Sequence, residues 1–517
     1  MVAAGILLSR IFGLIRNRAF AHYFGTSDAA DAFNAAFRIP NFLQNLFGEG
    51  VLSASFIPVY AGLRAQGDEA QARQLARAAA ALLALVSAVL VLVGVLVTPW
   101  LIALIAPGFQ GEKREVTIRL VRILFPGAGL LVLSAWCLGV LNSHRRFFLS
   151  YAAPVVWNLA IIAALVGFGG GRDQYPLAAI AAWGAVVGSL LQFAIQLPVV
   201  RRLTAGRSGP WAFTQPVRTV LRNFGPVFIG RGVVQISAYV DTVLASLLPT
   251  GAVAGLAYSQ VLYTMPMSLF GMSVSAAELP AMSSATGGGS ERAAFLRGRL
   301  EGGLRQIAFF VVPSAAGFLV LGDVIAAALY QSGEFTRQMA TYVWAILAGS
   351  AVGLLASTMG RLYAATFYAL YDTRTPLRYG VVRVGLTIGL GYLCAIPLPA
   401  ALGIAQRWGA AGLTASAGLA GWIEFLLLRR ALNRRIGVTG LPARLAIRLW
   451  AGAIGAGAIA TGLRLLLPIE QPIVLAAVLL SAYATVYFAM THGLGVPEAS
   501  MALRRLRPAR PGDPSGR

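Results

Sequence analysis

The chain has 517 residues, of which 57% are hydrophobic and 12% are charged, and its mean hydropathy is +0.72. A composition this apolar excludes an ordinary soluble enzyme and predicts a protein that crosses a membrane many times. The formal net charge of +23 does not indicate nucleic acid as a partner, because no soluble segment combines a basic stripe with exposed aromatic side chains.

Candidate spanning helices set the predicted fold class. A helix needs about 20 mostly apolar residues to cross the hydrocarbon core, and the sequence contains about fourteen such stretches. They cover residues 1–24, 29–62, 78–106, 120–142, 152–169, 177–200, 224–249, 253–285, 303–330, 339–369, 380–400, 408–428, 446–468 and 472–493. We therefore expect an all-α polytopic membrane protein. Arginines interrupt the first stretch and it lacks a small-residue cleavage pattern, so it predicts a retained helix.

The first two stretches carry many charges for segments at membrane depth. Such charges cost energy and usually mark the path of a substrate. They are Arg10, Arg16, Arg18, Asp31, Arg38 and Glu49. Gly13 and Pro40 interrupt the same stretches, with Asn41 beside the proline, a combination typical of a cavity lining or a hinge. The alternative is that each arginine reaches lipid headgroups or pairs with an acid such as Asp31.

Polar residues at membrane depth continue farther along the chain. Asn158 lies in the fifth stretch, and Arg231 and Asp241 lie in the seventh. The segment Leu46–Pro58 of the second stretch resembles Leu269–Pro280 of the eighth. An offset of six helices preserves orientation, so this similarity indicates two halves related as parallel repeats.

The charges of the loops predict the orientation. In chain order, the even-numbered connections hold most of the arginines, including Arg145, Arg146, Arg429 and Arg430, whereas the odd-numbered connections hold few. By the positive-inside rule, both termini and the even-numbered connections face the cytoplasm. The same rule accounts for the basic net charge, which also suits anionic lipid headgroups as neighbours.

Catalytic constellations are not found in the sequence. Its three histidines, His22, His144 and His492, are far apart and fit no metal-ligand spacing. The sole lysine, Lys113, lies in an odd-numbered connection, so no loop of the GxxxxGK[ST] type exists to hold a nucleotide phosphate. Both cysteines fall in apolar stretches and are expected to be small buried hydrophobes. We predict a transporter and not an enzyme, without cofactor or metal, driven by ions, membrane potential or the substrate gradient.

Short motifs follow one another in a fixed order through the first two stretches. They are Ser9-Arg10-x-x-Gly13-x-x-Arg16, Phe24-Gly25, Asp31-Ala32-Phe33, Ala36-Phe37-Arg38-Ile39-Pro40-Asn41, Glu49-Gly50 and Phe56-Ile57-Pro58. Together they resemble the N-terminal signature of the MurJ (MviN) lipid II flippases. The resemblance continues through Ala106–Phe109, Ala153-Pro154 with Asn158, Gly333–Thr336 and Tyr371–Pro376, and covers essentially the whole chain.

The resemblance implies the fold of the MOP exporter superfamily, similar to MATE transporters, with two six-helix lobes around a central cavity and two C-terminal helices. The implied division is an N-lobe at 1–205, a C-lobe at 206–435, a lipid-tail groove at 436–495 and a disordered basic cytoplasmic tail at 496–517. It also implies a multi-pass protein of the bacterial cytoplasmic membrane.

The resemblance further implies that the protein flips lipid II, an undecaprenyl-pyrophosphate-linked precursor, to the outer leaflet by alternating access. Guanidinium groups in the cavity suit the pyrophosphate through paired hydrogen bonds. The implied substrate contacts are Ser9, Arg10, Arg16, Asp31 and Asn158, with Arg38 and Arg231 as further cations, and the implied hinge or cavity positions are Gly13, Pro40, Asn41 and Glu49. Membrane lipids and cell-wall synthases are the other implied partners.

Three positions depart from the family pattern: Asn17 stands in place of an acid, Gln44 in place of a cation and Val261 in place of an arginine. A lowered headgroup affinity or a different polyprenyl-linked substrate follows if nothing compensates. Some family members hold sodium beside an acid of the seventh helix, which Asp241 matches. Because the eleventh stretch offers Arg383 and no acid, we expect Arg383 to neutralise Asp241 and sodium to be unnecessary.

Two other interpretations stay open. One is a different MOP exporter, for a polyprenyl-linked glycan or a small cationic drug, although a drug exporter is expected to have acids in its cavity and arginines dominate the first helix pair here. The other is a divergent paralogue that is inactive or serves as a scaffold.

Overall fold

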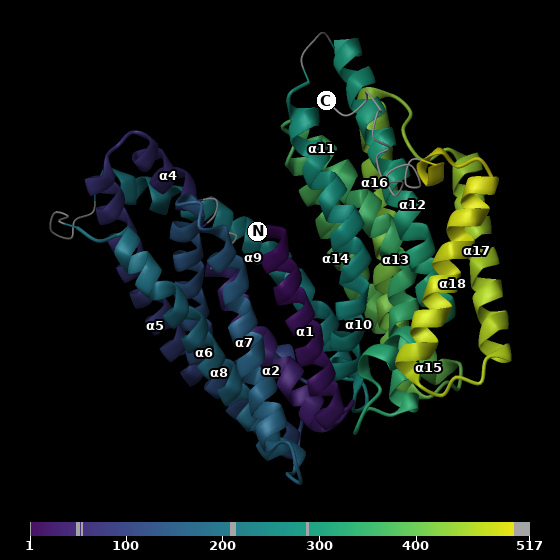
Figure 1. Ribbon diagram of the computed structural model, residues 1–517, viewed down its shortest axis with the longest axis horizontal. Coiled ribbons are helices and arrows are strands. Elements are labelled where there is room, and N and C mark those ends of the chain that lie inside the picture. Colours follow the sequence, from purple (N-terminus) through teal and green to yellow (C-terminus); the bar gives the residue numbers. More distant parts are fainter. Residues whose placement is uncertain (1, 48–51, 53–54, 207–213, 286–288, 501–517) are drawn as a thin grey trace, which may run out of the picture. The chain divides into compact units, whose positions relative to one another are not determined.

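The computed structural model describes residues 2–47, 52, 55–206, 214–285 and 289–500, with the backbone alone for 2–4, 6 and 225–238. Within these ranges the regular structure is helical apart from one isolated bridge between Ser332 and Phe335. The chain forms two compact units, Met1–Ala254 with Ser332–Thr336, and Gly255–Gln331 with Arg337–Arg517. Figure 1 traces the helices of each unit along the chain. Most of the expected disordered tail lies outside the described residues.

In the first unit, helices pack both on their neighbours in the sequence and on distant ones. They are α1 (Val2–Phe24), α2 (Asp28–Phe47), α4 (Ile57–Ala65), α5 (Glu69–Ile105), α6 (Gly111–Ser143), α7 (Phe147–Phe168), α8 (Gln174–Leu203) and α9 (Gln215–Ser246). Helix α1 packs on α7 and α2 packs on α6, while α8 packs on both α6 and α7 and α5 lies along α6.

The second unit contains the remaining helices. They are α10 (Ala252–Pro266), which begins in the first unit, a π-helical turn (Met267–Met272), α11 (Ser273–Ser283), α12 (Gly289–Tyr330), α13 (Arg337–Ala369), α14 (Arg374–Ala395), α15 (Pro397–Ala401), a 3-10 turn (Gln406–Trp408), α16 (Gly409–Ile436), α17 (Ala443–Leu466) and α18 (Pro472–Gly493). Helices α17 and α18 pack on each other and on α12.

The pairing of helices repeats between the two units. Helices α11, α12 and α16 pack on α13, and α14 packs on α16. The first unit has the same pairs in α2, α5 and α8 on α6 and α7 on α8. This repetition supports the duplication indicated by the sequence. Helices α13 and α16 approach closely at Gly353, where a Cβ would lie 2.4 Å from the Cα of Gly418, so only glycine fits there.

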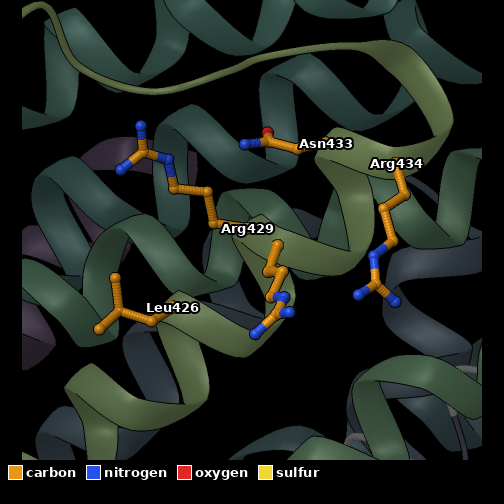
Figure 2. Close-up of a pocket in the computed structure, with 5 residues that line it drawn as sticks. Leu426, Arg429, Asn433 and Arg434 are labelled. Atoms are coloured by element: carbon orange, nitrogen blue, oxygen red, sulfur yellow. The ribbon is translucent and has the colours of Figure 1, made fainter.

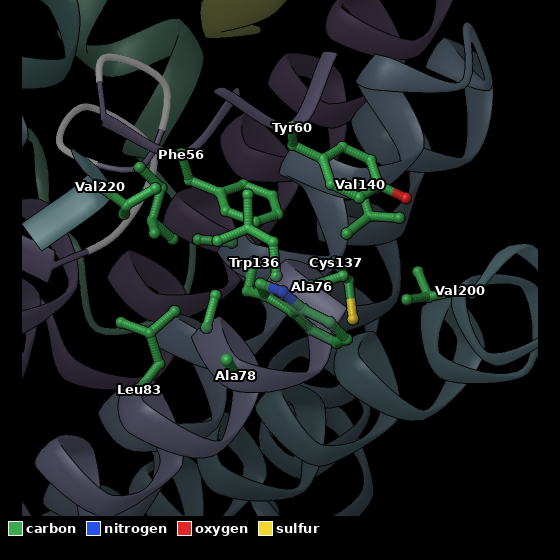
Figure 3. Close-up of a cluster of buried hydrophobic side chains, with 14 of the residues drawn as sticks. Phe56, Tyr60, Ala76, Ala78, Leu83, Trp136, Cys137, Val140, Val200 and Val220 are labelled. Atoms are coloured by element: carbon green, nitrogen blue, oxygen red, sulfur yellow. The ribbon is translucent and has the colours of Figure 1, made fainter. Parts of the chain in front are cut away.

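A buried apolar cluster holds one end of the first unit together. Phe56 and Tyr60 stack at 5.2 Å between ring centroids beside the fully buried Cys137 of α6. Figure 3 shows side chains of α4, α5, α6, α8 and α9 meeting in this cluster. Cys137 is therefore the buried hydrophobe that the sequence predicted, while Cys394 is only half-buried, and neither forms a disulfide.

Ten of the described helices are long and apolar enough to cross a membrane. The other four expected spans correspond to α1, α2 with α4, α9, and α10 with α11, so a total of fourteen stays a prediction. Several helices also begin earlier than their apolar stretch. Helix α5 begins at Glu69, where the Asp68 side chain accepts the Gln71 N–H at 2.9 Å, because a polar first turn outside the bilayer escapes a hydropathy criterion.

The expected domain limits stay predictions. By its contacts α9 belongs to the first compact unit together with α2 and α5, whereas the sequence interpretation assigned 206–435 to the C-lobe. Packing contacts group neighbours in one conformation, while a lobe is defined by what moves together, so the two divisions describe different properties.

Candidate functional site

On helix α1, the side chain of Arg10 lies between Gly13, which has open space beside it, and a stripe of exposed apolar residues. The helix packs on α7 through Gly5, where a Cβ would lie 2.9 Å from the Cβ of Tyr151, but a Cβ on Gly13 would meet nothing within 4 Å. With 3.6 residues per turn, Arg10 lies next to Gly13 around the helix, and its side chain is exposed. On the far side of Arg10 follow four exposed apolar residues, Leu7, Leu8, Ile11 and Ile15. This surface suits an amphipathic anion.

Arg16 is held in place by two neighbours. Its Nη2 and Nε donate to the side-chain oxygen of Asn17 at 2.8 and 3.3 Å. Its guanidinium carbon lies 5.0 Å from the centroid of the Trp157 ring on α7, within the range of a cation–π contact. Asn17 therefore orients Arg16 through an uncharged side chain.

Asn158 follows Trp157 on α7 and is buried, with 4% of its surface exposed. Its amide nitrogen donates to the carbonyl oxygen of Pro154 at 2.9 Å. Its side-chain oxygen is buried and accepts no hydrogen bond from the described residues. Arg16 therefore contacts the residue that precedes Asn158 on α7, while Ser9 is half-buried on α1.

Asp31 of α2 is enclosed by donors. Its Oδ2 accepts from the Lys113 ammonium and from the backbone N–H of Gly251, each at 2.8 Å, and its Oδ1 accepts from the backbone N–H of Ala254 at 2.8 Å. Lys113 also lies 2.7 Å from Asp28 Oδ1. The carboxylate, 1% exposed, thus joins α2, α6 and the start of α10. Its expected role as a substrate contact stays a prediction.

Two connections close over the turn between α1 and α2. Gly251 has a φ of 94°, and a Cβ there would lie 2.8 Å from the carbonyl oxygen of Thr26, so the turn before α10 requires glycine. The backbone N–H of Glu334, in the Ser332–Thr336 segment of the same unit, donates to the carbonyl oxygen of His22 at 2.8 Å. This end of α1 and α2 is therefore fixed by backbone contacts from distant parts of the chain.

The other expected positions on α2 are partly visible. Pro40 is buried inside the helix, and Arg38 and Asn41 are half-buried. The Tyr239 hydroxyl of α9 donates to the carbonyl oxygen of Arg38 at 2.7 Å, and the guanidinium of Arg38 interacts electrostatically with the carboxylate of Asp241. Glu49 lies outside the described residues. Arg231 lies in α9, but its side chain is likewise outside them.

The expected pairing of Arg383 with Asp241 stays a prediction, because the two residues belong to different compact units. The Arg383 Nη1 of α14 lies 3.1 Å from Glu424 Oε2 of α16, both in the second unit. Asp241 interacts with Arg38. Glu424 is the one acid of the twelfth stretch, and the sequence alone did not predict its pairing with Arg383.

Two contributors to the site were not predicted. Lys113 was assigned to a loop, although its being the only lysine among 42 basic residues was a signal that it is not interchangeable with the arginines. Trp157 had no signal beyond its place next to Asn158. Among the residues that the structure describes, no group of three histidine, cysteine or acidic side chains is placed to hold a metal ion.

Comparison with known proteins gives a consistent picture. The family model described as "Lipid II flippase MurJ" matches residues 20–498. The lipid II flippase MurJ of Burkholderia cenocepacia is 32% identical over 96% of this chain and 96% of its own length. The probable lipid II flippase MurJ of Rhizobium meliloti is 31% identical over 98% of this chain and 95% of its own length.

Solved structures agree in fold. A lipid II flippase MurJ in an inward closed conformation superposes with a TM-score of 0.77 at 22% identity, covering 98% of this chain and 99% of that one. An inward-facing MATE family transporter of the MOP superfamily reaches a TM-score of 0.66 at 16% identity, covering 82% of this chain and 95% of that one. The family match over nearly the whole chain and the identity to relatives of equal length lead to one conclusion: this chain belongs to the lipid II flippase MurJ family.

Proposed function

We propose that this protein flips lipid II from the cytoplasmic to the outer leaflet of the bacterial inner membrane by alternating access. The observation that carries the proposal is the family match over residues 20–498. The arrangement of α1 supports it, because an exposed Arg10 next to an apolar stripe offers one surface for an anionic head and another for a hydrocarbon chain.

Arg10 and Arg16 are the groups that we assign to the pyrophosphate. Arg16 is oriented by Asn17 and Trp157, so little side-chain entropy remains to be lost when a phosphate oxygen binds. The buried, unsatisfied oxygen of Asn158 is a hydrogen-bond acceptor for the sugar hydroxyls or amides of the head. Arg38 and Arg231 are further cations whose roles depend on the same proposal.

The polyprenyl tail is assigned to the apolar surfaces of α17 and α18. These helices are fixed to α12 by the Arg464–Asp323 ion pair, with hydrogen bonds of 2.7 and 3.2 Å, and by the Tyr487 hydroxyl donating to the Phe309 carbonyl oxygen at 2.7 Å. Ile447 and Ile454 of α17 are 68% and 63% exposed. A helix pair that is held on α12 by these contacts and exposes apolar side chains suits a long hydrocarbon chain.

Both termini are proposed to face the cytoplasm, as the loop arginines indicate. In this orientation an inside-negative potential favours outward movement of the anionic head by about 2.3 kcal/mol per charge for each 100 mV. Because Arg38 interacts electrostatically with Asp241, the acid that matches the sodium position, we propose that potential and substrate gradient suffice and that sodium is not needed. Cell-wall synthases that consume lipid II are the proposed protein partners.

The test is complementation of a bacterium depleted of its own lipid II flippase. Wild type is expected to restore growth, and Arg10→Ala and Arg16→Ala are expected to fail at equal amounts in the membrane. Arg119→Ala is the matched control, because Arg119 is an exposed arginine of α6 outside the proposed site. Purified protein in vesicles is then expected to expose lipid II to an enzyme added outside.

No growth with well-inserted wild type would reject lipid II as the substrate. Growth with both arginine variants at the level of the control would reject the assignment of the site on α1 while leaving the flippase itself in place.

A further inference from the structure

One face of α16 changes from apolar to basic along its length. Leu419, Ile423 and Leu426 are 50%, 37% and 52% exposed, and Arg430 and Arg434 continue the same line toward the helix end and are also exposed. Successive members are three or four residues apart, so they lie along one side of the helix. On a helix long and apolar enough to cross a membrane, exposed leucine and isoleucine side chains suit contact with lipid chains and not with water.

A pocket lies where the apolar part meets the basic part. Its volume is about 490 Å³, and it is lined by Leu426, Arg429, Arg430, Asn433 and Arg434. Figure 2 shows Leu426, Arg429, Asn433 and Arg434 extending from neighbouring turns of α16. The pocket therefore has a hydrocarbon contact and several hydrogen-bond donors within a few turns of one helix.

The structure divides the arginines at this helix end into two kinds. Arg429 Nε donates to the Thr439 carbonyl oxygen at 2.8 Å, and Arg435 pairs with Asp372 at 2.6 Å. Arg429 thus holds the connection that follows α16, and Arg435 holds the connection between α13 and α14. Arg430 and Arg434 have no hydrogen bond or ion pair with any described residue, so their donors are available to a ligand.

The helix end is rigid, which preorganises the pocket. The side-chain oxygen of Asn433 accepts from the Thr439 N–H at 3.0 Å and from its hydroxyl. This leaves the amide NH2 of Asn433 as a donor on the pocket side. Gly437, with a φ of 89°, ends α16 in a conformation that favours glycine.

We propose that this pocket binds the phosphate of an anionic glycerophospholipid of phosphatidylglycerol type. The phosphate lies between Arg430 and Arg434, the Asn433 amide donates to it, and one acyl chain follows Leu426, Ile423 and Leu419. Guanidinium groups bind phosphate through paired hydrogen bonds. A zwitterionic headgroup is disfavoured, because its ammonium would lie among unpaired arginines. The site is separate from the flipping site on α1 and does not depend on it.

The test is native mass spectrometry of the purified full-length protein, delipidated in detergent and titrated with palmitoyl-oleoyl phosphatidylglycerol or phosphatidylethanolamine. Wild type is expected to retain phosphatidylglycerol preferentially. Arg430→Gln/Arg434→Gln is expected to bind it at least about tenfold more weakly, since each arginine at a membrane surface contributes about a factor of five. The matched control is Arg444→Gln/Arg448→Gln, which removes two exposed arginines with the same spacing from α17, outside the pocket.

Three results would overturn the proposal. Equal retention of both lipids by wild type would show that charge recognition is absent, and equal losses in the control and in the α16 variant would show a general surface effect. Displacement of phosphatidylglycerol by millimolar inorganic phosphate would indicate a site for a soluble anion. Arg430→Lys/Arg434→Lys keeps the charge and the fold and is expected to bind with intermediate affinity, so the test stands even where the glutamine variant is poorly folded.

Discussion

The Lys113 ammonium lies 2.8 Å from Asp31 Oδ2 and 2.7 Å from Asp28 Oδ1, so the only lysine of the chain joins two acids of α2. It also lies 4.4 Å from the centroid of the Phe109 ring. The Asp31 carboxylate accepts two backbone N–H groups in addition. This arrangement fixes the start of α2 against the start of α6. Helix α2 begins four residues after the end of α1.

Replacing Lys113 with methionine is expected to destabilise the first unit strongly. The Asp31 carboxylate is 1% exposed and would remain buried without its cation, and breaking a buried ion pair from one side costs about 3–5 kcal/mol. Thermal unfolding in detergent is expected to show a clearly lower midpoint for Lys113→Met. The double variant Lys113→Met/Asp31→Asn is expected to recover part of the loss, because no buried charge is left uncompensated.

Arg119→Met serves as the control for Lys113→Met, because the Arg119 side chain is an exposed cation of the same helix. It is expected to unfold like wild type. If Lys113→Met and Arg119→Met unfolded at the same temperature, the ion pair would have no structural importance.

The sequence was informative where the signal is local. Within the described residues, each of the expected apolar stretches is mostly helical, because about twenty adjacent apolar residues indicate a spanning helix without reference to the rest of the chain. The partner of Asp31 was not predictable in this way. Lys113 is 82 positions away, and their contact depends on how α2 packs on α6. The alternative that Asp31 pairs with an arginine of the first two stretches favoured the nearest cation in sequence, which is not the nearest in space.

The same distinction between local and long-range signals holds for the candidate site. The motifs around Arg10, Arg16 and Asn158 were recognised from their order and spacing in the sequence. The contact of Arg16 with Trp157 joins α1 and α7, so it follows only from how these two helices pack. Arg383 was recognised as a cation at membrane depth, but its pairing with Glu424 was not predicted.

Asn17 is expected to act by orienting Arg16. Its side-chain oxygen accepts two hydrogen bonds from the guanidinium, and a hydrogen bond to a charged group contributes about 1.5 kcal/mol when partly buried. Asn17→Ala is therefore expected to lower the flipping rate at limiting lipid II by about tenfold. The measurement is the initial rate of lipid II exposure in vesicles containing equal amounts of protein.

Asn17→Asp is the matched variant, because it keeps the acceptor oxygen and the shape of the side chain. It is expected to stay within a few fold of wild type. If Asn17→Ala exposed lipid II as fast as wild type, the orienting role of Asn17 would be rejected.

Flipping is expected to be independent of sodium. The acid that matches the sodium position is Asp241, and the Arg38 guanidinium already interacts with it electrostatically. Vesicles prepared with potassium in place of sodium, at the same membrane potential, are expected to give the same rate of lipid II exposure. Glu424→Gln is expected to leave this independence unchanged, since it removes an acid without creating a cation site. Loss of activity on removing sodium would contradict the assignment.

His144 is expected to make stability depend on pH. The histidine lies between α6 and α7, and its Nε2 is 3.0 Å from the Tyr60 hydroxyl. Burial first, and then the nearby Arg64, lower the pKa of His144 below its usual value of 6.5. The unfolded chain therefore binds more protons than the folded protein just below pH 6.5, and stability falls as the pH decreases through that range. The loss levels off once the pH is below the pKa of the folded protein.

Comparing His144→Gln with wild type isolates this effect from the other histidines. The glutamine amide can still bond to the Tyr60 hydroxyl but does not titrate, so its unfolding midpoint is expected to decrease less than that of wild type between pH 7.5 and pH 5. Tyr60→Phe removes the hydroxyl and keeps the histidine buried beside Arg64, so the dependence on pH is expected to persist. Burial and Arg64 shift the pKa of the imidazole, which glutamine lacks. If the unfolding midpoints of wild type and His144→Gln changed in parallel with pH, protonation of His144 would not contribute to the dependence.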